Sequence, residues 1–213
     1  MPLLERSTLP NLITVSRIAL APVVFLLLFV PTFTACFVAW LLFLAAAFSD
    51  LWDGWLARKH GWISDFGKLW DPVADKLLLV ATFVPFYILS HRTAPAELPF
   101  LGGLPLWVLI VVFGREAAVT ALRAWAARNG RILAAGREGK LKAVFQNIFS
   151  GTTIFWIALR TEAERAGWHG EFWDFWQGFH GFVLLTTLAL AVALTVYSFA
   201  VYLRQWLRPA VSR

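Results

Sequence analysis

Four aspartates, Asp50, Asp53, Asp71 and Asp75, are the residues of this sequence whose type and spacing are best suited to chemistry. Each pair is spaced to lie on one face of a helix, since side chains three or four positions apart are neighbours there. The surrounding sequence is apolar enough for a membrane, where one carboxylate costs about 3 kcal/mol. Four together need a compensating cation or a polar cavity, and they predict a functional site.

The aspartates belong to a longer pattern, D-x2-D-G-x2-A-R-x8-G-x3-D-x3-D. Its fixed positions are Asp50, Asp53, Gly54, Ala57, Arg58, Gly67, Asp71 and Asp75. At average residue usage, eight such matches recur by chance about once in 10^9 windows. Gly54 leaves room for a ligand against the helix backbone, and Arg58 adds a cation one turn later.

The elements that position these residues are membrane helices. The 213 residues are 59% hydrophobic and 15% charged, with a mean hydropathy of +0.66, so we expect an all-α integral membrane protein. Six spans are predicted, at roughly 12–30, 35–56, 69–90, 104–127, 139–160 and 179–206. They form a single domain over residues 1–213, with an N-terminal interfacial segment at 1–11 and a periplasmic-side loop at 161–178.

Most of the 19 Lys and Arg residues flank one set of span ends. The positive-inside rule therefore places both termini and the aspartates in the cytoplasm. The net charge of +6 is explained by this topology and not by nucleic-acid binding. The single cysteine, Cys36, excludes a disulfide within the chain. Residues before it loosely resemble a lipoprotein signal, but the sequence after Cys36 continues as an apolar helix, so we retain the first span.

Polar positions outside the pattern are open to two interpretations. Thr14 and Arg17 lie one turn apart and either mark an interfacial segment or reach toward the aspartates. Arg115 and Glu116, which as adjacent residues are not expected to face each other, either hold the bundle together or contribute to a site. Lys142, with its neighbour Lys140, serves either as a positive-inside anchor or as part of an anion site.

Carboxylates are hard oxygen ligands, which suit Mg2+, Mn2+ or Ca2+ better than zinc or copper. Divalent ions beside Arg58 and open glycine backbone suit a pyrophosphate.

The complete pattern resembles the signature of the CDP-alcohol phosphatidyltransferases, membrane enzymes that displace CMP from a CDP-linked donor with an alcohol. The flanking sequence is similar to that of members that use sn-glycerol 3-phosphate, in Pro10 to Thr14 with Arg17, Asp71 to Lys76, Arg115-Glu116 with Ala121 to Arg123, and Gly139 to Lys142. The resemblance implies transfer of the phosphatidyl group from CDP-diacylglycerol to that acceptor. It also implies six transmembrane helices, a homodimer and a two-metal site facing the cytoplasm of a bacterial inner membrane. Ala143 departs from the threonine that often follows Lys142 in the family.

Carried over to this sequence, the resemblance assigns residues to four roles. Asp75 is the general base. The ligands of two Mg2+ or Mn2+ ions are Asp50, Asp53, Asp71 and Asp75. The CDP group is bound by Thr14, Arg17, Asp53, Gly54, Ala57, Arg58 and Gly67. The acceptor phosphate needs its own cations, and the candidates are Arg115, Arg123, Arg137, Lys140 and Lys142.

Two other functions are weighed. Another acceptor, such as an inositol phosphate, phosphatidylglycerol or serine, would leave the aspartates unchanged. A divalent-cation transporter would carry polar residues across both halves of the bilayer, whereas here they stop on the cytoplasmic half.

Overall fold

The computed structural model describes residues 8–60, 65–92, 97–129 and 136–207. It describes their side chains except at positions 8–10, 50–60, 65, 68 and 137. The described residues form six α-helices, which confirms the all-α prediction. They are α2 (Thr8–Leu28), α3 (Phe33–His60), α4 (Asp65–Ser90), α5 (Leu106–Arg128), α6 (Arg137–Ala166) and α7 (Glu171–Leu207).

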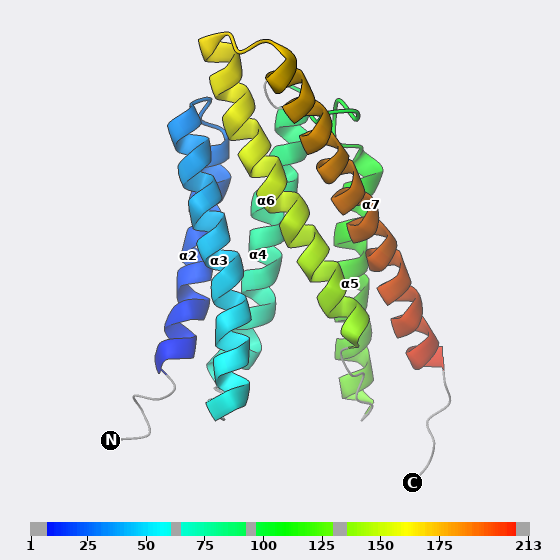
Figure 1. Cartoon of the computed structure of the whole chain (residues 1–213). Helices are drawn as coiled ribbons and strands as arrows, with labels where there is room; N and C mark the ends of the chain where they lie inside the picture. The colour runs from blue at the N-terminus through cyan, green and yellow to red at the C-terminus, as the bar shows by residue number, and fades with distance from the viewer. Residues whose placement is uncertain (1–7, 61–64, 93–96, 130–135, 208–213) are drawn as a thin grey trace.

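The helices run alternately in opposite directions, so that the start of α2 and the end of α7 lie at the same end of the bundle (Figure 1). Helix α2 packs against α3 and α4 to form a first triplet, and α7 packs against α5 and α6 to form a second. The two triplets meet mainly where α3 packs against α6. The first turns of α4 and α6 and the last turns of α3, α5 and α7 therefore share the end that carries the termini (Figure 1).

Within the described part of the chain, three helical segments are long and apolar enough to cross a membrane: Asn11–Leu28, Leu69–Ser90 and Glu171–Leu207. Helix α3 contains a shorter apolar stretch, Phe33–Ser49, that ends where Asp50 begins the polar part of the helix. Helices α5 and α6 are interrupted by charged or amide residues, a departure from the uniform hydrophobicity of a simple span. The composition and these apolar helices make the chain a membrane protein.

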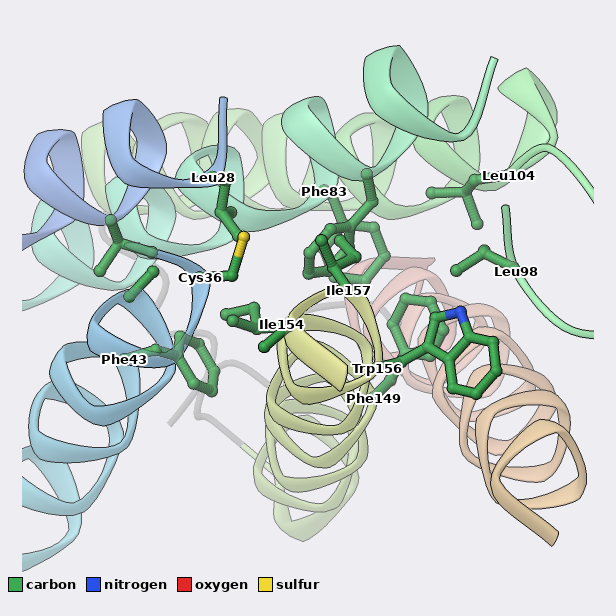
Figure 2. Close-up of a cluster of buried hydrophobic side chains, with 14 of the residues drawn as sticks. Leu28, Cys36, Phe43, Phe83, Leu98, Leu104, Phe149, Ile154, Trp156 and Ile157 are labelled. Atoms are coloured by element: carbon green, nitrogen blue, oxygen red, sulfur yellow. The ribbon is translucent and has the colours of Figure 1, made fainter. Parts of the chain in front are cut away.

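Aromatic side chains join the triplets in the interior (Figure 2). Phe83 of α4 packs against Phe149 of α6, with ring centroids 5.5 Å apart, and Phe43 of α3 is buried in the same hydrophobic cluster. Cys36 is 1% exposed within this core, so the structure places its thiol inside the bundle. The burial of large rings where helices cross stabilises the arrangement that holds the polar end in place.

The segment 161–178, predicted as a connection between spans with a short amphipathic helix as one interpretation, is mostly helical. Helix α6 continues to Ala166 and ends at Gly167, whose left-handed backbone (φ 66°) terminates the helix without the strain of a side chain. Arg160 pairs with Glu164 one turn later and also donates to Gln177 of α7 at 2.8 Å. These contacts extend both helices beyond their apolar sections, because charged side chains stabilise them where hydropathy does not predict a span.

Candidate functional site

Two aspartates of the pattern face α2 from the first half of α4. Thr14 donates to Oδ1 of Asp71 at 2.6 Å. The guanidinium of Arg17 donates from Nη1 to Asp75 Oδ1 at 2.8 Å and from Nη2 to Asp71 Oδ1 at 3.3 Å. Of the two interpretations of Thr14 and Arg17, the structure therefore supports the one in which they reach the aspartates.

Burial is unequal within this first cluster. The Arg17 side chain is 2% exposed, whereas those of Asp71 and Asp75 are 45% and 58% exposed. A buried guanidinium is kept charged by its carboxylate partners, and its planar fork fixes the orientation of both. The carboxylates are thus held by α2 on one side and remain accessible on the other.

A second cluster joins α5, α6 and α7. Glu116 Oε1 accepts from Arg115 Nη1 at 3.0 Å and from the ammonium of Lys142. Arg115 also donates from Nε to Ser198 Oγ at 3.2 Å. The expectation that Arg115 and Glu116 do not face each other is wrong, because a long arginine side chain can curl back to its neighbour when a third group draws the carboxylate to the same place.

Helix α7 also contributes Tyr202, which lies between two arginines. Its ring centroid is 5.5 Å from Cζ of Arg115 and 5.0 Å from Cζ of Arg123, and its hydroxyl hydrogen-bonds with Arg123. Sequence reasoning missed both Ser198 and Tyr202. Their spacing of four positions places both hydroxyl side chains on one face of α7, but other hydroxyl residues of this helix, such as Thr187 and Thr195, do not stand out from them in the sequence.

A hydrogen bond joins the two triplets next to the clusters. Lys76 of α4, the residue after Asp75, donates from Nζ to Thr120 Oγ1 of α5 at 2.7 Å. Thr120 lies one turn after Glu116 on the same helix. Adjacent positions of α4 therefore contact the first cluster through Asp75 and the helix of the second cluster through Lys76.

The structure describes the side chains of only some of the other predicted site residues. Gly67 is buried at the start of α4, and Lys140 is exposed on the first turn of α6. The side chains of Asp50, Asp53, Gly54, Ala57, Arg58 and Arg137 lie outside the described ones. The helical segment that carries the first five of these is the second half of α3, at the same end of the bundle as the start of α4 (Figure 1).

The first cluster fits a hard divalent cation. Asp71 and Asp75 supply partly exposed carboxylates from one face of α4, and carboxylate oxygens are preferred by Mg2+ and Mn2+. Among the described side chains, no group of three or more His, Cys, Asp or Glu residues gathers at one point. The expected ligand set is completed by Asp50 and Asp53, whose side chains are outside that search.

The fold and the site together define a class of protein. It is a helical membrane protein with clustered carboxylates and guanidinium groups. The sequence profile of the CDP-alcohol phosphatidyltransferases matches residues 7–211, and the chain belongs to this family. The family is generally dependent on divalent cations.

Three similar proteins carry related names. The CDP-diacylglycerol–glycerol-3-phosphate 3-phosphatidyltransferase 1 of Arabidopsis thaliana is 33% identical over 93% of this chain and 62% of its own length. The probable phosphatidylglycerophosphate synthase of Mycobacterium tuberculosis is 35% identical over 70% of this chain and 66% of its own. The Bacillus subtilis CDP-diacylglycerol–glycerol-3-phosphate 3-phosphatidyltransferase is 36% identical over 66% of this chain and 72% of its own. The chain thus spans slightly less than two thirds of the first two relatives.

Proposed function

We propose that this protein transfers the phosphatidyl group of CDP-diacylglycerol to sn-glycerol 3-phosphate, releasing CMP. The names of its relatives support this acceptor. The observation that carries the proposal is the pair of partly exposed carboxylates, Asp71 and Asp75, that the buried Arg17 holds on α4. Lys76, the next residue after Asp75, is bonded to Thr120 on the helix that carries Arg115 and Glu116. A proton acceptor on α4, with cations on a helix that α4 contacts, suits a small substrate that has a hydroxyl at one end and a phosphate at the other.

In this reaction Asp75 accepts the proton of the acceptor's primary hydroxyl. The hydroxyl oxygen forms a bond to the lipid-linked phosphorus of the donor, and the bond from that phosphorus to the oxygen of CMP breaks. Arg17 orients Asp75 through the 2.8 Å contact and disperses negative charge at Asp71. Thr14 fixes the Asp71 carboxylate. The acceptor phosphate is held by Arg115, Arg123 and Lys142, with Lys140 and Arg137 at the start of the same helix α6 as Lys142.

Two Mg2+ or Mn2+ ions, held by Asp50, Asp53, Asp71 and Asp75, supply positive charge to the phosphoryl oxygens when bound. The CDP group lies along Gly54, Ala57, Arg58 and Gly67, next to Asp53. Glycine and alanine suit this role because they allow a nucleotide to approach helix backbone closely.

The topology proposed with this function has six spans, both termini in the cytoplasm and the site open to the cytoplasm of a bacterial inner membrane, in a homodimer. Residues 1–213 form one domain. The start of α2, the end of α7 and the start of α4 lie at the same end of the bundle, which supports this orientation. Lys and Arg accumulate on the cytoplasmic side of a membrane, and soluble acceptors are available there.

The test is CMP release by the purified full-length protein with CDP-diacylglycerol, Mg2+ and one acceptor at a time. Glycerol 3-phosphate is expected to support turnover, and inositol phosphate, phosphatidylglycerol and serine are not. Release with another acceptor and none with glycerol 3-phosphate would refute the proposed acceptor. Divalent-cation uptake into vesicles without CMP release would favour the transporter.

A matched pair of variants tests the role of Asp75. Asp75→Asn is expected to lower kcat by a factor of about 10^3 because it removes the proton acceptor and keeps the side-chain shape. Asp174→Asn is the control, since Asp174 is exposed near the start of α7 at the opposite end of the bundle. Turnover of Asp75→Asn within tenfold of the wild type would remove Asp75 from the base role.

A further inference from the structure

Glu116 is an acidic residue among the cations proposed to bind the acceptor phosphate. Its carboxylate is bonded to both Arg115 and Lys142, and its side chain is 18% exposed. The side chains of its two partners are 9% and 7% exposed. A phosphate that binds these cations must share them with a carboxylate already in place, so Glu116 opposes the ligand unless it has another use.

Glu116 is the hydrogen-bond acceptor that Arg115 and Lys142 share. Lys142 has Glu116 as its described hydrogen-bond acceptor, while Arg115 is additionally bonded to Ser198 and packed over Tyr202. Without Glu116, Arg115 and Lys142, whose side chains are nearly buried, would repel each other in a poorly hydrated setting. One carboxylate between two cations holds them in a fixed arrangement.

The charge of the cluster provides a second argument. Arg115, Arg123 and Lys142 contribute three positive charges and Glu116 one negative charge, a balance of +2 among these described side chains. A phosphate monoester carries about −1.5 to −2 at neutral pH. A phosphodiester such as phosphatidylglycerol carries one negative charge, and serine is a zwitterion. The balance therefore matches a monoester and disfavours these two alternatives.

We infer that Glu116 is the positioning and specificity-determining residue of the acceptor site. Its carboxylate orders Arg115 and Lys142 before the acceptor binds and sets the charge of the cluster for a dianionic phosphate monoester. This inference rests on the proposed function for its substrate, but the anion site itself can be tested without turnover. Ser198 and Tyr202 extend the same ordering from α7.

The experiment measures both Michaelis constants and kcat of the full-length protein in detergent. Glu116→Gln is expected to raise KM for glycerol 3-phosphate at least tenfold and to leave KM for CDP-diacylglycerol within twofold. Glu116→Asp, which restores the charge, is expected to recover part of the loss. Ser198→Ala keeps every charge and removes one hydrogen bond, so a rise of about fivefold in the acceptor KM is expected. Glu164→Gln is the control, as Glu164 pairs with Arg160 at the other end of α6.

A measurement of phosphate binding separates this inference from the proposed function. Inorganic phosphate is expected to raise the thermal unfolding temperature of the wild type and of Glu164→Gln, and to have at most half that effect on Glu116→Gln. An unchanged or lower acceptor KM in Glu116→Gln, an equal rise for both substrates, or an undiminished phosphate effect would overturn the role of Glu116. Lack of turnover with glycerol 3-phosphate in the wild type, with the phosphate effect as expected, would refute the acceptor and retain the anion site.

Discussion

Arg17 offers a quantitative test of the first cluster, because it is the buried cation between two carboxylates. Arg17→Met keeps an apolar stem of similar length and removes the guanidinium bonds to Asp75 at 2.8 Å and to Asp71 at 3.3 Å. A hydrogen bond to a charged group contributes about 1.5–3 kcal/mol to stability. The second contact is long and both carboxylates are about half exposed, so water replaces part of what is lost.

We therefore expect Arg17→Met to lower the free energy of unfolding by about 2 kcal/mol. In a chain of this size that corresponds to a fall of about 4–8 °C in Tm. Arg17→Lys should recover about half of the loss, because an ammonium keeps the charge but cannot span two carboxylates as a planar fork does. The assay is thermal unfolding of the purified protein in detergent, without divalent cations.

The control for this substitution is Arg165→Met. Arg165 pairs with the carboxylate of Glu162, but the Arg165 side chain is 74% exposed. The Tm of Arg165→Met should therefore stay within about 1 °C of the wild type. Mg2+ should reduce the difference between Arg17→Met and the wild type, since a bound cation would replace the missing positive charge. A Tm for Arg17→Met within 1 °C of the wild type would refute the view that Arg17 neutralises the two aspartates.

Two further predictions concern the metal and the packing at the far end of the bundle. Excess chelator should abolish CMP release and added Mg2+ or Mn2+ should restore it, whereas full turnover in chelator would contradict the proposed ligand set. Gly181→Ala should lower Tm by about 4–8 °C, because a Cβ at Gly181 would lie 2.6 Å from Phe100 Cε2 and from Pro99 Cβ. Gly178→Ala, where no atom lies within 4 Å, is its control, and equal melting of the two variants would show that this contact can relax.

The fold could be predicted as far as hydrophobicity determined it. The six helices follow from the apolar runs, and the start of the pattern at Asp50 coincides with the end of the apolar stretch Phe33–Ser49. The region after Arg160 was predicted as a connection between spans, and the extent of its helices could not be predicted because hydropathy does not account for ion pairs between neighbouring turns, such as Arg160 with Glu164. Packing between helices distant in sequence, such as α3 against α6, carries no signal in a single sequence.

For the site, too, part could be predicted from the sequence and part could not. Asp71 and Asp75 could be paired from their spacing alone, and their contacts with Thr14 and Arg17 were one of two interpretations. The bond between Arg115 and Glu116 could not be predicted from spacing, because it depends on Lys142 arriving from another helix. Ser198 and Tyr202 were missed because the chemistry they support is recognisable only when α5 and α7 are seen in contact.

The division of the bundle into two triplets has a consequence for how such a chain can be altered. The aspartate cluster is built by residues 8–90, and the cations around Glu116 by residues 106–207. These two parts of the chain meet mainly where α3 packs against α6. On the proposed function, the residues for the donor and those that choose the alcohol are encoded in consecutive stretches of the gene. A chimaera can join residues 8–90 of this chain to the second stretch of a relative that uses a different alcohol. We expect this chimaera to use the relative's alcohol, provided that the side chains where α3 packs against α6 match.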